Sequence, residues 1–174
     1  STTPSSFFNP DFNASNALYY NDGNGIFSLE EENPFMAICR GDLKFVDINN
    51  DNNLDLFQTG RDNNTLVSSF YINDGNGDFA EINAGVNRRT NSAVDFADID
   101  NDGDLDALIT GKNASIGSFS ILYENMGDGS FQISDNTPFN GLQFGTVNFV
   151  DVDGDLDSDV FLTGLRNTGL SSIG

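Results

Sequence analysis

Residues 98–106 read Asp98-Ile99-Asp100-Asn101-Asp102-Gly103-Asp104-Leu105-Asp106, with an aspartate at positions 1, 3, 5, 7 and 9 and a glycine at position 6. This spacing wraps a short loop around one hard cation, because side-chain oxygens arrive alternately from a tightly turned backbone. Calcium accepts six to eight such oxygens, and a glycine permits the sharp turn in the middle. The stretch therefore predicts a calcium-binding loop.

The same nine-residue pattern occurs at two other places in the chain. It starts at Asp47 and, in altered form, at Asp151, so that the three loops begin 51 and 53 residues apart. A second marker, a turn of Asn, Asp and Gly, starts at Asn21, Asn73 and Asn125, at intervals of 52 residues. A Thr-Gly pair also follows each Asp loop at nearly the same offset. Independent markers that share one period of about fifty residues predict a repeat protein.

Each repeat reads as four short strands. In the middle of the chain these are residues 92–98, 105–110, 118–123 and 130–133, which are short alternating runs separated by Asn, Asp and Gly clusters. The Asn-Asp-Gly turns supply residues that tolerate positive φ, as tight hairpins require. We therefore predict an all-β fold of β-propeller-type blades, each of four antiparallel strands, in about three repeats of roughly 52 residues.

Two segments carry a family resemblance. Residues 96–106 resemble the core of the FG-GAP/VCBS repeats, which are related to the integrin α-subunit propeller, and residues 121–131 resemble the other half of that repeat. The resemblance covers roughly residues 17–164. It implies four-stranded blades, one calcium loop per blade, and extracellular or cell-surface adhesion, recognition or scaffolding. It does not imply one activity, because fold alone does not fix function.

The resemblance and the periods divide the chain into two parts. Residues 1–16 contain Pro4 and Pro10 and are of low complexity, which is typical of an extended N-terminal arm or a linker. Residues 17–174 hold three FG-GAP/VCBS-like repeats, at about 17–66, 67–118 and 119–174, as circularly offset blades.

The loops differ from an EF-hand, which needs flanking helices and a Glu at position 12. Position 12 is Gln58, Ile109 or Leu162, so the cation is expected in a strand–loop–strand unit. In the first two loops we expect side-chain oxygens at positions 1, 3, 5 and 9 and the backbone carbonyl at position 7 to bind calcium. These residues are Asp47, Asn49, Asp51, Asp55 and Asn53 in the first loop, and Asp98, Asp100, Asp102, Asp106 and Asp104 in the second. The first loop has fewer charges and should bind calcium more weakly.

The third loop departs from the pattern, because Gly154 falls at position 4 and Leu156 at position 6. Two outcomes are open. Its aspartates still converge on a cation, or the register slips and the site is degraded. The candidate ligands are Asp151, Asp153, Asp155, Asp157 and Asp159. The sequence thus predicts two Ca²⁺ sites and leaves a third undecided.

Ordinary solvated acidic turns are the competing interpretation of these loops. The three loops hold 13 aspartates, out of 27 acidic residues in the chain. So many carboxylates in short loops repel one another unless cations lie between them. We therefore favour metal, in a structural role, and expect chelation to loosen the blades.

Composition limits the partners. The net charge of −20 argues against nucleic acid and anionic membranes, which attract basic surfaces. No apolar run is long enough to span a bilayer. Weak calcium sites fill where calcium is millimolar, which predicts an extracellular or cell-surface location for a secreted chain. The single cysteine, Cys39, excludes a disulfide framework and is expected to be a buried apolar residue.

Catalysis has little support in the sequence. Histidine is absent, which removes the usual general base, and most carboxylates that could act as acid or base lie in the loops. We therefore expect no enzyme activity and no catalytic residues.

Two short motifs give weaker evidence about function. The tripeptide Arg40-Gly41-Asp42 is a known adhesion signal, but here it leads into an expected strand, so that chance is the better explanation. Acceptor sequences for N-glycosylation place possible sugars on Asn13, Asn63 and Asn113, in corresponding connections of the repeats.

The two ends of the repeat region do not match. It opens with the second half of a repeat and closes with the first half of another. Three arrangements are open. Further blades of a longer propeller complete the halves, the halves join within the chain as a small three-bladed ring, or they join between molecules by strand addition. Head-to-tail addition would give a ring or an open filament.

Two functions follow from these observations. The first is a structural or adhesive module that self-associates head to tail into a fibre or surface assembly by strand complementation. The second is a ligand-binding propeller fragment of a larger secreted or cell-surface protein, which recognises an extracellular glycan or protein. One form of this second function is an accessory domain of a carbohydrate-active enzyme. The sequence does not identify a ligand.

Overall fold

A computed structural model describes residues 14–62, 65–113, 117–135 and 137–166 of the 174-residue chain. The secondary structure of these residues is entirely β, which confirms the predicted fold class. The described residues contain no helix that could cross a membrane. The strands in chain order are β1 (Leu18–Asn21), β2 (Phe27–Glu30), β3 (Cys39–Val46), β4 (Asp55–Asp62), β5 (Thr65–Asn73), β6 (Phe79–Ile82), β7 (Thr90–Ala97), β8 (Asp106–Asn113), β9 (Gly117–Asn125), β10 (Phe131–Ile133), β11 (Leu142–Val150) and β12 (Asp159–Arg166).

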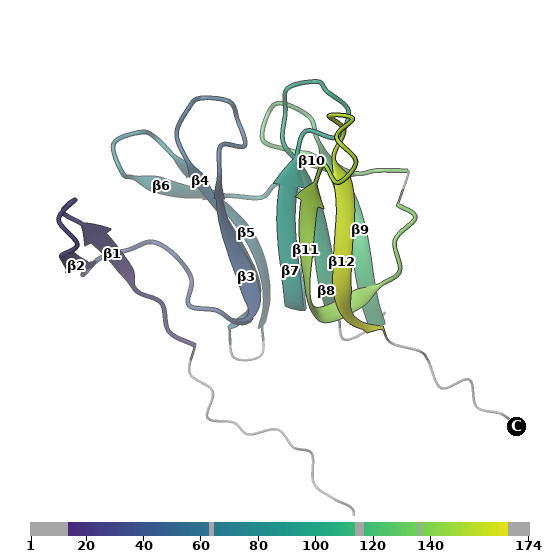
Figure 1. Ribbon diagram of the computed structural model, residues 1–174. Helices are drawn as coiled ribbons and strands as arrows, with labels where there is room; N and C mark the ends of the chain where they lie inside the picture. Colours follow the sequence, from purple (N-terminus) through teal and green to yellow (C-terminus); the bar gives the residue numbers. More distant parts are fainter. Residues whose placement is uncertain (1–13, 63–64, 114–116, 136, 167–174) are drawn as a thin grey trace, which may run out of the picture.

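The strands form two complete blades and two halves (Figure 1). Strands β3 to β6 make one four-stranded antiparallel blade, and β7 to β10 make the next, each in simple chain order. Strands β11 and β12 pair as the first half of a third blade, which a single bridge between Leu142 and Phe119 attaches to β9. Strands β1 and β2 form a separate hairpin. The four-stranded blade expected from the repeat is therefore confirmed twice.

The first strands of successive blades lie next to one another. Strand β7 packs against both β3 and β11. The Val94 N–H donates a 3.1 Å hydrogen bond to Asp42 Oδ2, and the Phe149 N–H donates a 2.8 Å bond to Asp95 Oδ2. These bonds fix the position of each first strand against the blade before it.

The hydrophobic core lies between blades rather than within one sheet. The larger cluster joins the first two blades and includes Val46, Ile48, Phe57, Phe70, Ala84, Val94, Ala107, Ile109, Tyr123 and Phe131. The smaller cluster joins the second blade to β11 and β12, and consists of Ala93, Leu108, Leu122 and Val147. Apolar residues from alternate positions of facing sheets supply both clusters, as expected for stacked blades.

A bulge interrupts the first strand of every blade at the same place. Arg40, Asn91 and Phe144 have φ of 53°, 52° and 54°, and the pairing shifts beside each of them. The Thr-Gly pairs lie opposite these bulges. A Cβ on Gly41 would lie 1.7 Å from the Thr59 carbonyl oxygen, so the two backbones meet without room for a side chain. The Thr-Gly marker therefore reflects this close approach.

The Asn-Asp-Gly turns also repeat in detail. In each turn the second residue donates its N–H to the carbonyl oxygen four residues later, at 3.0 Å, starting from Asp22, Asp74 and Met126. The asparagine before it accepts a hydrogen bond from the N–H of the following glycine, as in Asn73 with Gly75 at 3.0 Å. The predicted turns are confirmed.

The two half-blades remain separate in this structure. Among the described residues, β1 pairs with β2 alone and β12 pairs with β11 alone. The halves thus do not complete one another within the chain here.

Two local expectations differ from the structure. The Arg40-Gly41-Asp42 tripeptide lies inside β3, at its bulge, and not before the strand. The Asp42 carboxylate accepts a hydrogen bond from the Val94 N–H of β7, which agrees with a structural role for the tripeptide. Cys39 is only partly buried, because it begins β3 where the strand reaches the edge of the core.

Candidate metal-binding loops

The first two Asp loops have the same hydrogen-bond pattern. The position 1 carboxylate accepts the N–H of position 5 through one oxygen, at 3.2 Å in both loops, and the N–H of position 6 through the other, at 2.8 Å in the first loop and 3.0 Å in the second. The position 5 carboxylate accepts the N–H of position 7 at 2.8 and 2.9 Å. The side chains thus hold the backbone in a tight turn with carboxylates on its inner side.

The third loop keeps the same left-handed positions, although its position 1 carboxylate accepts the N–H of position 4, at 2.7 Å. In all three loops the residues at positions 4 and 6 have left-handed φ. They are Asn50 (58°), Asn52 (68°), Asn101 (62°), Gly103 (95°), Gly154 (82°) and Leu156 (76°). Gly154 therefore stands where every loop needs positive φ, and the register does not slip. The strain falls on Leu156 instead, because a leucine rarely adopts this conformation.

The structure brings carboxylates together in two of the loops. One oxygen from each of Asp98, Asp100 and Asp106 lies within 4.8 Å of the others, and the same holds for Asp151, Asp153 and Asp155. Asp102, Asp157 and Asp159 lie outside these two groups.

In the first loop an amide replaces the second carboxylate of such a group. Asn49 stands at position 3, and its Nδ2 donates a 3.1 Å hydrogen bond to Asp51 Oδ2. This loop therefore offers fewer charged oxygens near position 3 than the other two.

The residue at position 7 turns its side chain away from the loop centre. Asn53 and Asp104 lie against Gly75 and Gly127, in the Asn-Asp-Gly turn of the same blade, where a Cβ would come within 2.9 and 2.7 Å of their side-chain oxygens. Asp104 Oδ1 also accepts a 2.6 Å hydrogen bond from Asn50 Nδ2 of the neighbouring loop. This placement agrees with the expectation that position 7 offers its backbone carbonyl.

The aspartate at position 9 ties each complete loop to its blade. Asp55 and Asp106 are 0% and 2% exposed. One oxygen of each accepts the N–H of position 2 at 3.1 Å, and the other accepts the N–H of Asn73 or Asn125 at 2.8 Å. These asparagines open the Asn-Asp-Gly turn. The two sequence markers therefore meet at one hydrogen bond, a link that spacing alone did not reveal.

Burial makes these two carboxylates costly to ionise. Desolvation raises the pKa of Asp55 and Asp106, although their N–H partners act in the opposite direction. Neighbouring charges add to the rise, Asp51 and Asp47 for Asp55, and Asp100 and Asp102 for Asp106. A cation bound among these oxygens would offset both effects, and an all-oxygen donor set is the one that calcium prefers.

Asp159, at position 9 of the third loop, is exposed. Its Oδ2 accepts the N–H of Val152 at 3.1 Å, as in the other loops. The described part of the chain supplies it no third-strand asparagine like Asn73 or Asn125. The third loop is therefore correctly folded but attached to an incomplete blade.

The remaining predicted sites are the three asparagines of the N-glycosylation acceptor sequences. Asn13 and Asn63 lie outside the described residues. Asn113 is the last residue of β8 and is partly buried. Glycosylation of these asparagines stays a prediction.

Comparison with known proteins agrees with the repeat. The family model of the FG-GAP-like repeat matches residues 47–109, which run from the first Asp loop through the second and into β8. Comparison with curated proteins and with solved structures gives no match. The matched span contains two Asp loops and one complete Asn-Asp-Gly turn. Residues 47–109 are thus similar to an FG-GAP-like repeat, and the resemblance that the motifs predicted is confirmed over this span.

Proposed function

We propose that this chain is a non-catalytic, extracellular, calcium-binding repeat module with a structural or adhesive role. The FG-GAP-like repeat supports this proposal, since such repeats occur in extracellular proteins and are generally non-catalytic. The observation that carries it is the buried position 9 carboxylate, at Asp55 and Asp106, which joins an acidic loop to the sheet of its blade. A cation in the loop would stabilise that connection.

Calcium would be held by the residues expected from the spacing. In the second loop these are Asp98, Asp100, Asp102 and Asp106 with the carbonyl of Asp104. Bound calcium would supply positive charge to a cluster of carboxylates and so stabilise the folded blade.

Calorimetric titration with calcium tests this role, with the D100N variant beside wild type. Asp100 is exposed, and asparagine keeps the oxygen that accepts the Asp102 N–H. We expect D100N to weaken binding at one site and to leave stability in chelator unchanged. The matched control is D78N, which replaces an exposed aspartate outside the loops. Absence of saturable calcium binding in wild type would refute the metal assignment.

We further propose that copies of the chain join head to tail, with the β1–β2 hairpin of one completing the β11–β12 half-blade of another. The register follows from the complete blades. Leu56 pairs with Tyr71 in the first blade and Ala107 with Tyr123 in the second. The equivalent residues of the two halves are Val160 and Tyr19.

Exposure supports this pairing. Tyr71 and Tyr123 are 3% and 0% exposed, whereas Tyr19 is 54% exposed. Phe161 and Phe27 are likewise exposed, although their counterparts in complete blades, such as Phe57 and Phe131, are buried. Joining the halves would remove this apolar surface from water, which favours association.

Cysteine cross-linking tests the register. In a C39S background, at least one of the pairs Y19C/V160C and L18C/F161C should form disulfides between molecules, because one of two adjacent cross-strand pairs is always non-hydrogen-bonded and close. The control pair Y20C/V160C is shifted by one residue and should not cross-link. Light scattering in calcium and in chelator gives the mass. A monomer at high concentration in calcium would contradict head-to-tail assembly.

The second candidate function is recognition of an extracellular glycan or protein. It includes a role as the accessory part of a carbohydrate-active enzyme. One observation favours it over a purely structural role. A cavity between strands contains a buried arginine whose hydrogen-bonding capacity is only partly used.

A further inference from the structure

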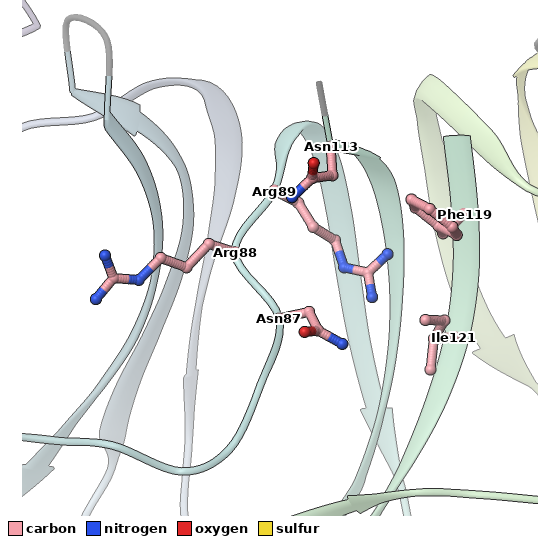
Figure 2. A pocket seen from close by; sticks show the side chains of 6 residues that line it. All are labelled: Asn87, Arg88, Arg89, Asn113, Phe119 and Ile121. Carbon is pink, nitrogen blue, oxygen red and sulfur yellow. The ribbon is translucent and has the colours of Figure 1, made fainter. Parts of the chain in front are cut away.

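The cavity lies beside Arg89 (Figure 2). Its lining residue Asn113 ends β8, which begins at the Asp loop with Asp106, so the cavity lies toward the end of the blade opposite that loop. Its volume is about 80 Å³, several times what one water molecule needs. The lining residues are Asn87, Arg88, Arg89, Asn113, Phe119 and Ile121. Figure 2 shows the Arg89 side chain extending toward Phe119, whereas Arg88 points away from it. Arg89 is therefore the cation that the cavity presents.

Arg89 is 1% exposed, yet its donors are only partly satisfied. Its Nη2 donates a 2.9 Å hydrogen bond to the Tyr123 hydroxyl. The guanidinium carbon also lies 5.4 Å from the centre of the Phe119 ring. Nε and Nη1 are buried and have no hydrogen-bond partner among the residues that the structure describes. Leaving donors of a buried charged group unpaired is costly, so these two atoms indicate a missing acceptor.

The fold does not require arginine at this position. Arg89 stands immediately before Thr90, which pairs with Lys112 next to the bulge. The residues at the same place in the other repeats are Ile38 and Leu142, both apolar. The second repeat thus has a buried cation where the other two have an apolar residue. A structural role alone does not explain this difference.

No carboxylate of the described residues neutralises this cation. None of the six lining residues is acidic, and the Lys44–Asp95 ion pair does not involve Arg89. The chain nevertheless has a net charge of −20. A buried charge normally has a partner of opposite sign, so the partner of Arg89 is expected to come from a ligand.

We propose that this cavity binds the carboxylate of a ligand through Arg89. The planar guanidinium matches a carboxylate, and one positive charge balances one negative charge. Phe119 and Ile121 offer apolar surface for the carbon atoms next to the carboxylate. The volume admits a group of a few heavy atoms, such as the end of an acidic side chain or the carboxylate of an acidic sugar. The site does not depend on calcium binding or on head-to-tail assembly.

Nuclear magnetic resonance on the whole chain in calcium tests the site, with sodium propionate as probe and sodium chloride at equal ionic strength as reference. The buried Arg89 Nε–H gives a side-chain signal that should shift saturably with propionate. Propionamide, which has nearly the same shape without the charge, should bind at least about tenfold more weakly, as expected for loss of a charge-assisted hydrogen bond.

Two variants provide the controls. R89L introduces the residue found at 142 and should fold as wild type by circular dichroism, while its affinity for propionate falls at least about tenfold. R88L removes an exposed arginine that points away from the cavity and should leave propionate binding unchanged. A blocked glutamate and glucuronate, tested separately, then distinguish a protein side chain from an acidic sugar as the source of the carboxylate.

Three results would overturn the proposal. The first is the absence of a saturable shift at Arg89, which would mean that the cavity holds only water. The second is equal affinity for propionate and propionamide. The third is an equal loss of affinity in R88L and R89L, because that would indicate general attraction of anions to surface charge.

Discussion

Asp106 accepts a 2.8 Å hydrogen bond from the backbone N–H of Asn125, and this bond joins the Asp loop of the second blade to its third strand. Asp55 and Asn73 repeat the contact at the same distance in the first blade. The position 9 aspartate thus belongs to the sheet as much as to the loop. Its structural role can be separated from metal binding by working in chelator.

The D106A variant should lose about 3 kcal/mol of unfolding free energy in chelator. The substitution leaves two N–H groups, those of Ile99 and Asn125, without their acceptor, and each loss costs about 1–3 kcal/mol, partly offset by removal of a desolvated charge. Urea denaturation measures the change. D78A, an exposed control, should change stability by less than about 0.5 kcal/mol. Equal effects of both variants would contradict the structural role.

The G41A variant should destabilise the first blade by about 3 kcal/mol, because the new Cβ meets the Thr59 carbonyl oxygen. S92A, at the corresponding place of the second blade, should cost only about 1 kcal/mol, since it loses a single hydroxyl contact with Thr59. Thermal denaturation compares the two. A G41A protein as stable as S92A would show that the bulge can shift freely.

The L156G variant should stabilise the third loop by about 1 kcal/mol. Leu156 has a φ of 76° and a side chain that is 89% exposed, so glycine relieves strain without loss of packing. The reciprocal change G103A, at the same position of the second loop, should destabilise by a similar amount. Hydrogen exchange of β11 and β12 measures the first effect, and denaturation of the whole chain measures the second.

Replacing Arg89 by leucine should raise the stability of the ligand-free chain by about 1–3 kcal/mol, because an apolar residue often stabilises a site that held an unpaired buried charge. R88L should be nearly neutral. Denaturation in a buffer without carboxylates checks this result. A large loss of stability in R89L would show that the hydrogen bond from Arg89 to Tyr123 contributes more than the two unpaired donors cost.

Tyr71 provides a test at alkaline pH. Burial raises its pKa above the ordinary value of a tyrosine, and the nearby Glu81 acts in the same direction. A raised folded-state pKa contributes stability that is fully present below the unfolded pKa of about 10 and is lost as pH rises through the folded value. Tyrosinate absorbance should therefore show a late titration step that is missing in Y71F. The same step in Y71F would assign it to another tyrosine.

The fold class and the turn geometry of the Asp loops could be predicted from the sequence, because both depend on the local spacing of residues. Positive φ at positions 4 and 6 follows from Asn and Gly residues that are visible in the sequence, except at Leu156. The third loop is ambiguous in the sequence because its glycine, Gly154, stands at position 4 and not at position 6. In the structure position 4 has positive φ in every loop.

Contacts between residues far apart in the chain could not be predicted from the sequence. Asn125 Nδ2 donates a 2.9 Å hydrogen bond to the Ile48 carbonyl, 77 residues away, and nothing in the local pattern marks that partner. The Arg89 cavity was missed for a similar reason. Arg89, one of seven basic residues and directly after Arg88, has no distinctive spacing in the sequence. The difference from the other repeats appears only when they are aligned through their strand pairing.

The exposed carboxylate of Asp159 would couple calcium binding at the third loop to strand addition at β12. If a third strand supplied by a neighbour donates its N–H to this carboxylate, it also orders an oxygen next to the third loop. Strand addition would then raise the calcium affinity of that loop by some factor, and thermodynamic reciprocity requires calcium to raise the affinity for the strand by the same factor. The concentration of free calcium would thus set the length of any assembly, and dilution of calcium would release its end subunits first.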